Sequence, residues 1–161
     1  DVYKRQIPAR ALPEGMRMAA YRPGDEARWL AIHEATGIYG SIGPELYERE
    51  FGDRRESLPE RQWFVLDGDR PIATATAWFP QEDQPATFGR LHWVAVRPEY
   101  QRRGIASALT EQALLRLGDL GYLTAYLTTA KDNHPAIALY RSLGFAPLIR
   151  SEEEREAWTR L

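Results

Sequence analysis

The alternation of apolar and polar positions along this chain predicts a domain built from both strands and helices. Short apolar runs bounded by turn residues indicate strands, and apolar positions at three- to four-residue intervals indicate helices. The predicted strands cover residues 16–21, 62–66, 71–79, 87–96, 123–128 and 145–149. The predicted helices cover residues 25–35, 45–51, 104–120 and 133–143, and a capping box that starts at Ser151 indicates a short charged helix after them. This order favours a layered α/β domain with antiparallel hairpins first and a crossover connection later.

One short segment, Gln101-Arg102-Arg103-Gly104-Ile105-Ala106, points to a binding site. It joins a predicted strand to the longest predicted helix. The first backbone N–H groups of a helix have no intrahelical acceptor, and the positive end of the helix dipole lies there. Arg102 and Arg103 add positive charge at the same place. The segment therefore predicts a site for a phosphate-bearing ligand, although a plain connection with solvated arginines would have the same local pattern.

The composition limits which classes of function are open. With 161 residues and 43% hydrophobic positions, the chain is long enough for one domain with a proper core. The formal net charge is -2 and no apolar run is long enough to cross a bilayer, so we expect no nucleic-acid partner, no membrane association and a cytoplasmic location. There is no cysteine for a disulfide or a thiolate nucleophile. His33, Glu34 and His134 lack metal-ligand spacing, so no metal is expected.

The first six residues, Asp-Val-Tyr-Lys-Arg-Gln, look like the translation of an adapter used to prepare sequencing libraries. We therefore expect residues 1–6 to be a sequence-assembly scar. Residues 7–161 are expected to form a single domain, whose natural start and end stay open.

Two segments, residues 91–109 and residues 133–145, form a joint motif. The first reads LHWVAVRPEYQRRGIASAL and the second reads NHPAIALYRSLGF. An apolar strand, a proline and Arg/Gln-x-x-Gly-x-Gly/Ala, followed later by Asn-x-x-Ala-x-x-x-Tyr-x-x-x-Gly-Phe, is the pattern of a known family. The chain resembles the GNAT superfamily of acetyl-CoA-dependent N-acyltransferases over residues 16–149.

The resemblance implies an α/β (α+β) fold with a GNAT-like mixed, mostly antiparallel sheet. The sheet would have roughly six to seven strands, splayed between the fourth and fifth, flanked by about four helices plus a short C-terminal helix. Many members of the family end in a two-strand hairpin over the acceptor side, where this chain has a predicted charged helix. How the acceptor cleft closes stays open, as does whether a partner chain supplies a strand in a homodimer.

The resemblance also assigns acetyl-CoA as the donor and names the residues that would bind it. Backbone N–H groups in the turn would hold the pyrophosphate, and the strand before the turn would pair with the pantetheine arm as an added strand would. The implied cofactor-binding residues are Val94, Ala95, Val96, Gln101, Arg102, Arg103, Gly104, Ile105, Ala106, Asn133 and Tyr140.

The resemblance further implies direct attack of an amine on the thioester, with no protein nucleophile. Tyr140 would protonate the departing thiolate, because a phenol stays protonated at neutral pH. The N–H of Val94 would polarise the thioester carbonyl. His92 is the best local candidate for the base that deprotonates the amine; a buried core histidine and a water chain ending on an acidic group are the alternatives.

The acceptor is expected to be a small-molecule or peptide amine. The residues implied for its site are Tyr39, Trp78, Phe79 and Glu34, with Glu45 as an alternative carboxylate, and all could instead be core or rim residues. We therefore expect an N-acetyltransferase that acts in a ternary complex. The rival interpretation is a coenzyme A-binding regulatory module with little or no catalytic activity.

Overall fold

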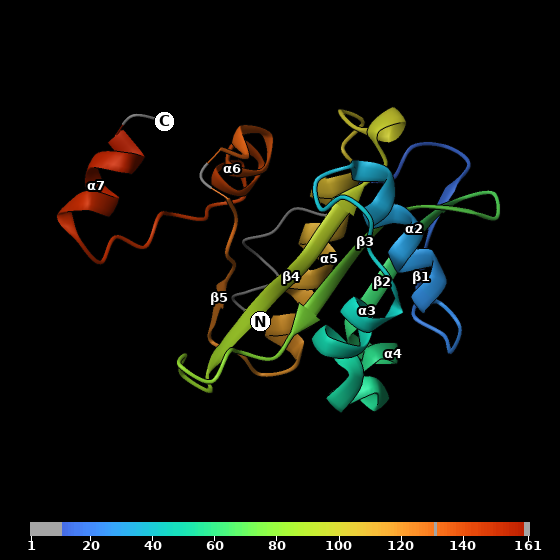
Figure 1. The fold of residues 1–161 in the computed structure, drawn as a ribbon, viewed down its shortest axis with the longest axis horizontal. Coiled ribbons are helices and arrows are strands. Elements are labelled where there is room, and N and C mark those ends of the chain that lie inside the picture. Colours follow the sequence, from blue (N-terminus) through green and yellow to red (C-terminus); the bar gives the residue numbers. More distant parts are fainter. Residues whose placement is uncertain (1–10, 131, 160–161) are drawn as a thin grey trace. The chain divides into compact units, whose positions relative to one another are not determined.

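The computed structural model describes residues 11–130 and 132–159 of the chain. The chain divides into two compact parts, one up to Leu127 and one from Thr128 onward, which are described separately below (Figure 1). None of the helices in the described ranges is both long enough and apolar enough to cross a bilayer.

The first part is built on a five-stranded sheet whose strands follow one another in chain order. Its strands are β1 (Met16–Ala20), β2 (Gln62–Asp67), β3 (Arg70–Trp78), β4 (Phe88–Val96) and β5 (Thr124–Tyr126). All neighbours pair antiparallel except β4 and β5, which run parallel. The predicted mixed, mostly antiparallel sheet is thus confirmed.

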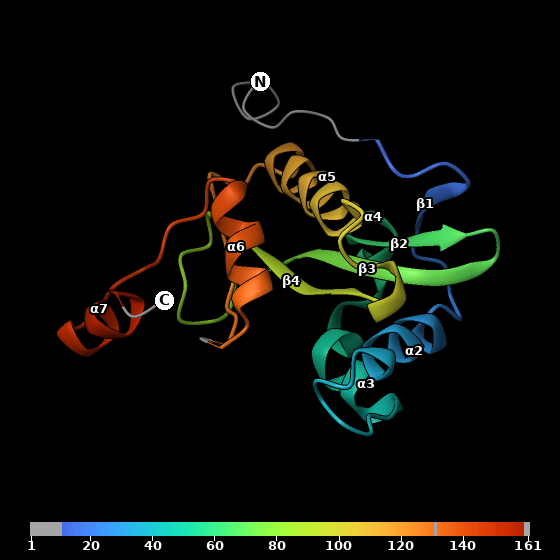
Figure 2. The same cartoon turned by 90° about the horizontal axis from the view of Figure 1, so that it is seen from above.

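Helices cover both faces of this sheet. The helices of the first part are α2 (Glu26–Thr36), α3 (Pro44–Phe51), α4 (Leu58–Arg61) and α5 (Ile105–Asp119), with 3-10 turns at Gly52–Ser57 and Pro98–Tyr100. Figure 2 shows α5 on one side of the sheet and α2 and α3 on the other. The single-turn α4 and the two 3-10 turns were not predicted, because such short elements carry no apolar periodicity.

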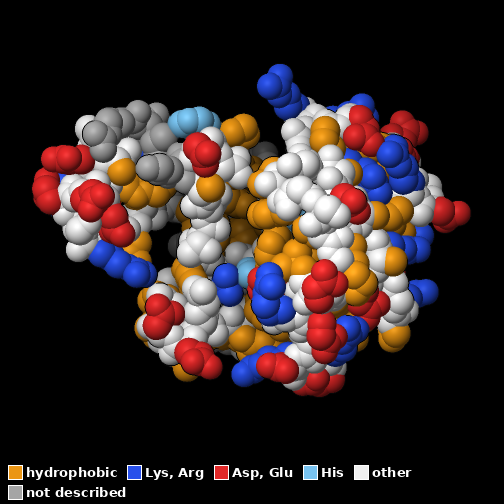
Figure 3. Space-filling view, in the orientation of Figure 1, with side chains coloured by type: hydrophobic (Ala, Val, Ile, Leu, Met, Phe, Trp, Pro, Cys, Tyr) orange, Lys and Arg blue, Asp and Glu red, His pale blue; other side chains and the backbone are white. Residues whose placement is uncertain are grey.

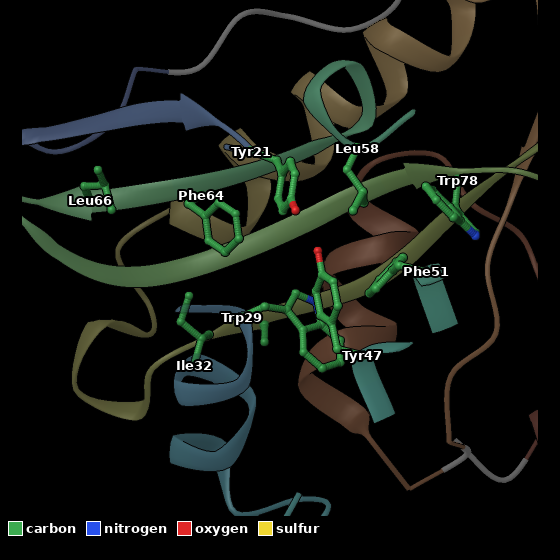
Figure 4. Packing of buried hydrophobic residues seen from close by; sticks show 10 residues of the cluster. Tyr21, Trp29, Ile32, Tyr47, Phe51, Leu58, Phe64, Leu66 and Trp78 are labelled. Atoms are coloured by element: carbon green, nitrogen blue, oxygen red, sulfur yellow. The ribbon is translucent and has the colours of Figure 1, made fainter. Parts of the chain in front are cut away.

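The core between the sheet and the pair α2–α3 is rich in aromatic side chains (Figure 4). Trp29 of α2 is fully buried, and its ring meets those of Tyr47 and Phe51 of α3 nearly edge-on at centroid distances of 5.3 and 5.5 Å. Edge-to-face pairs of this kind add to the free energy gained by burying the rings. They fix α3 against α2 at one angle.

Two polar connections hold α3 in the same place. The Tyr47 hydroxyl donates to Oε1 of Gln62 at 2.9 Å, and the Gln62 amide donates to Thr76 at 3.0 Å, so this buried chain is satisfied at each step. On the outside, Arg55 forms ion pairs with Glu26 of α2 and Glu48 of α3. The helix α3 is therefore joined to the sheet on its inner side and to α2 on its outer side.

The fourth and fifth strands separate soon after they meet. Their pairing covers only Phe88–Arg90 of β4 and Thr124–Tyr126 of β5. Among the described residues, β4 has no strand partner on this side over residues 91–96. The structure thus agrees with the splay that was expected between these strands.

The second part contains α6 (His134–Ser142) and α7 (Glu152–Thr159). Asn133 caps α6, with its side chain accepting from the Ala136 N–H, and Ser151 accepts from the Glu154 N–H at the start of α7. Both helices were predicted from these caps. The capping pattern is thus enough to locate each helix start.

The strand predicted over residues 145–149 is wrong, and the sheet has five strands among the described residues rather than six to seven. The segment is apolar, but Pro147 has no N–H to give to a ladder. Leu148 is 67% exposed and Ile149 is 37% exposed, so the apolar run is not buried as a core strand would be. An apolar run alone does not supply the neighbour with which a strand must pair.

Gly89 of β4 offers a test of how closely α5 packs on the sheet. A Cβ at this position would lie 2.6 Å from Cδ2 of Leu117 and 2.9 Å from the Tyr122 ring. We expect Gly89→Ala to lower the free energy of unfolding by about 1–3 kcal/mol, measured by urea denaturation. Gly52→Ala is the control, because a Cβ there meets only the Glu48 side chain, which is 61% exposed and can move. Equal stability of the two variants would contradict this close approach.

Candidate functional site

A β-bulge in the middle of β4 creates the candidate site. In the register with β3, Thr74 pairs with Ala95 and Thr76 pairs with His92, so two steps on β3 span three on β4. The extra residue makes room for a local turn of the backbone, and Trp93 adopts the left-handed region with φ at 52°. A non-glycine residue rarely adopts this conformation, and such strain is concentrated at functional sites.

The bulge directs two consecutive side chains to the same face of the sheet. In a regular strand His92 and Trp93 would point to opposite faces. Here the His92 ring lies 5.8 Å from that of Phe51 in α3, and the Trp93 ring lies 5.2 Å from that of Trp29 in α2. Both side chains therefore face the helices α2 and α3, next to the β4 edge that lacks a strand partner.

His92 meets a carboxylate from α3. Its Nε2 lies 3.3 Å from Oε2 of Glu50, and the side chains are 8% and 26% exposed. The hydrogen bond with His92 holds the pKa of the Glu50 carboxyl below its ordinary value. Burial lowers the pKa of the His92 imidazole, an effect that the hydrogen bond with Glu50 opposes. At neutral pH the pair is thus an ionised carboxylate beside a neutral imidazole, which can accept a proton.

A chain of aromatic rings extends from His92 in both directions. On one side Trp93 leads to Tyr39, at a centroid distance of 4.9 Å, and Tyr39 is 50% exposed. On the other side Phe51 leads to Trp78 and then to Phe79, with steps of 5.1 and 5.2 Å. The structure thus connects three of the four residues predicted for the acceptor site to His92.

The four predicted acceptor residues differ in their surroundings. Trp78 is only 7% exposed, so it is mainly a core residue. Phe79 lies between the guanidinium groups of Arg54 and Arg61, at 4.0 and 3.6 Å from its ring centroid. Glu34 is exposed, and no described interaction links it to His92 or to the aromatic rings around it. Tyr39 is the residue of this set with both an exposed surface and a contact to the bulge.

Two residues that contact His92, Glu50 and Trp93, were not singled out in the sequence. Glu50 comes three residues after buried Tyr47 and directly before buried Phe51, so helical spacing could have placed it at the edge of the buried face of α3. Glu34 and Glu45 were named instead as the acidic candidates. The orientation of Trp93 had no local signal, because the bulge appears only in the register of β4 with β3.

The turn that follows β4 has the backbone expected of an anion site. Arg102 and Gly104 both adopt the left-handed region, with φ at 64° and 79°, on either side of Arg103. No side chain caps α5, so the N–H groups of its first turn have no acceptor from the helix or from a cap. Tyr100 anchors the turn by donating to Asp67 at 2.7 Å.

Two side chains of this turn donate hydrogen bonds to nearby backbone carbonyls, and both of its arginines are exposed to solvent. Gln101 donates to the Val96 carbonyl at 3.1 Å, which ties the turn to the end of β4, and Arg103 donates to the Glu99 carbonyl at 3.2 Å. Arg102 and Arg103 are exposed. Acidic and basic side chains are interspersed on the face shown in Figure 3, so no single sign of charge dominates it.

The remaining predicted residues lie on β4 and in the second part of the chain. Ala95 and Val96 pair with β3, whereas Val94 lies in the bulge without a register partner. In the second part, the Tyr140 ring packs against that of Phe145 at 5.9 Å, and Asn133 caps α6. Within the described residues, no group of three or more His, Cys, Asp or Glu could hold a metal ion.

Comparison with known sequences identifies the family to which these features correspond. The sequence model of the acetyltransferase (GNAT) family matches residues 27–145. A mycothiol acetyltransferase from Pseudarthrobacter chlorophenolicus is 34% identical over 149 residues, which covers 86% of this chain and 45% of the relative. The chain thus spans less than half the length of this relative.

Solved structures show the same fold. A GCN5-related N-acetyltransferase from Sphaerobacter thermophilus is 25% identical and superposes with a TM-score of 0.69, covering 85% of this chain and 43% of that one. The structure of AAC(6')-Iy in complex with the bisubstrate analogue CoA-S-monomethyl-acetylneamine has a TM-score of 0.66 at 15% identity, covering 84% of this chain and 94% of that one. The second likeness concerns the fold alone.

The buried His33, whose ring contacts those of Trp29 and Trp93, makes the fold sensitive to acid. His33 is 1% exposed, and burial lowers its pKa from 6.5 to about 3. Between these values the unfolded chain binds a proton that the folded protein does not, so the free energy of unfolding falls as the pH falls. His92 contributes with the same sign. We expect His33→Phe to lose less stability than the wild type between about pH 7.5 and about pH 5, measured by urea denaturation.

The matched control is His134→Gln, because His134 is exposed on α6 and its replacement should leave the acid sensitivity of the wild type unchanged. An equal loss of stability in the wild type and in His33→Phe would show that His33 is not the acid-sensitive group.

Proposed function

Since this chain belongs to the acetyltransferase (GNAT) family, we propose that it transfers an acetyl group from acetyl-CoA to an amine. The observation that carries the proposal is that the edge of β4 without a described strand partner is connected to the uncapped start of α5 by one short segment, residues 97–104. A strand edge can take an extended ligand arm, and a helix start can take a diphosphate. Coenzyme A has both groups, joined in this order.

The donor would bind mainly through the backbone. The N–H groups from Arg102 to Ala106 would hold the diphosphate, and the left-handed residues Arg102 and Gly104 would turn them toward it. Residues 94–96 would pair with the pantetheine arm. Asn133, which the family motif assigns to the same arm, would bond it while capping α6.

The reaction needs a free amine, a polarised carbonyl and a protonated leaving group. In the proposed mechanism His92 takes one proton from the ammonium form of the acceptor, and the amine lone pair attacks the thioester carbon. The N–H of Val94 stabilises the developing oxyanion. The carbon–sulfur bond then breaks, Tyr140 gives its proton to the thiolate, and the second proton of the amine nitrogen returns to Tyr140. The products are the N-acetylated acceptor, coenzyme A and one proton.

The acceptor would enter on the side of α2 and α3. Tyr39 and Trp93 offer ring surface beside His92, which suits the apolar part of a small amine or a peptide end. Relatives of the chain are mycothiol acetyltransferases, so a panel of primary amines should include the acceptor of those enzymes.

The turn before α5 is tested by removing its two exposed charges. We expect the double variant Arg102→Ala, Arg103→Ala to bind CoA about tenfold more weakly by isothermal titration calorimetry, because about 1.4 kcal/mol of phosphate contact is lost. Arg17→Ala, which removes one exposed arginine from β1, is the control. Pantetheine lacks the diphosphate, and its affinity should not change. Equal weakening of CoA and pantetheine would contradict a diphosphate site at this turn.

Tyr140 is tested by removing only its hydroxyl group. We expect Tyr140→Phe to lower kcat for acetyl transfer by about a hundredfold or more, because the thiolate then leaves without its proton donor. The affinity for CoA should stay nearly unchanged in calorimetry. Unaltered turnover would remove Tyr140 from the mechanism. Tight CoA binding with no transfer to any amine, in the wild type as well, would favour a regulatory module over an enzyme.

A further inference from the structure

The contact between Glu50 and His92 has a chemical consequence beyond holding α3 to β4. The two atoms that meet are Nε2 of the imidazole and Oε2 of the carboxylate. An ionised carboxylate can only accept a hydrogen bond, so the imidazole nitrogen that faces it must carry the proton. In a neutral imidazole the other nitrogen, Nδ1, then has the free lone pair.

We propose that Glu50 is a positioning residue that fixes this tautomer, so that Nδ1 of His92 is the atom that takes the proton from the acceptor amine. The proposal rests on the function proposed above and names a residue of the same site. When Nδ1 takes the proton, the imidazole becomes a cation with protons on both nitrogens, and the Nε2 proton stays directed at Glu50. The cation later returns the Nδ1 proton to water.

The charges around His92 favour this role for Glu50. Burial disfavours the imidazolium form of His92 most, Arg90 on β4 adds to this effect, and His33 on α2 also interacts electrostatically with His92. Glu50 on α3 is the group that opposes them. The imidazole is 8% exposed, so little water is available to stabilise a cation there. Without the carboxylate, His92 would be a weaker base.

The position of Glu50 is set by packing that does not depend on His92. Tyr47, three residues before Glu50, and Phe51, the residue directly after it, are both buried against Trp29. Tyr47 also donates to Gln62 of β2. Since α3 is held in this way, the carboxylate stays at the imidazole before any substrate arrives, and no reorganisation is needed during the reaction.

The tautomer can be measured directly on the full chain. The protein has three histidines, so long-range proton–nitrogen correlation spectra of the labelled imidazoles can be assigned with a His92→Gln variant. We expect the wild-type His92 to be the tautomer protonated on Nε2. Glu50→Ala should shift His92 toward a mixture of tautomers, and Glu50→Gln should lower its pKa because the opposing negative charge is lost. A wild-type His92 protonated on Nδ1, or a titration unchanged in Glu50→Gln, would overturn the proposal.

A matched control comes from the same helix. Glu48→Gln makes the same chemical change two residues away, where the carboxylate faces Arg55 and is 61% exposed. Its effect on the His92 titration should be small, because an exposed charge is screened by solvent. An effect as large as that of Glu50→Gln would show that net charge, rather than the contact, sets the behaviour of His92.

The kinetic consequence separates positioning from simple support of the fold. With an amine from the panel and acetyl-CoA, Glu50→Gln should lower kcat at least about tenfold. The acidic limb of the pH profile of kcat/KM should move to lower pH, because His92 is then a weaker base. The affinity for CoA should stay unchanged. Glu50→Asp, which keeps the charge, should restore the position of the limb in part. A limb that does not move would contradict the role of Glu50 in catalysis. If no amine is turned over and no CoA binds, the proposed function fails, whereas the tautomer measurement still decides on the pair itself.

Discussion

The candidate site depends on one local distortion, the bulge at Trp93. A regular β4 would pair with β3 along its whole length and would send His92 and Trp93 to opposite faces. The left-handed backbone at Trp93 costs free energy, and packing of its indole against Trp29, His33 and Tyr39 offsets that cost. The core under α2 and α3 therefore maintains the geometry in which the imidazole of His92 lies next to the aromatic ring of Trp93, which contacts that of Tyr39.

The same distortion links the two halves of the proposed chemistry. Val94 follows the bulged residue and has no register partner on β3, and beyond it the strand runs into the turn before α5. Backbone groups that would hold the pantetheine arm, at residues 94–96, thus directly follow the side chains of His92 and Trp93 that would meet the acceptor. Covalent geometry keeps these residues close along the strand, and the packing of Trp93 against α2 holds the bulge that orients them.

Much of this arrangement could be predicted from the sequence, because it depends on local patterns. The caps at Asn133 and Ser151, the hairpin between β2 and β3 and the turn that ends at Gly104 all carry residues that favour one backbone conformation. What was missed depends on contacts between distant residues. The bulge appears only in a register between two strands, and the approach of Glu50 to His92 joins positions 42 residues apart. The strand predicted at residues 145–149 failed for the converse reason, since no strand in the described part of the chain pairs with it.

The double connection between α2 and α3 has a consequence for how this architecture can vary. Arg55 joins Glu26 to Glu48 on the outside, and the rings of Trp29, Tyr47 and Phe51 join the same helices inside, so the connecting segment 37–43 is not what holds them together. Tyr39 of that segment packs on Trp93, whereas its exposed neighbour Ile38 is free to change through mutation. Substitutions at this exposed position would diversify the range of acceptors while Tyr39 and the pair of Glu50 and His92 stay intact, which makes the scaffold a starting point for directed evolution.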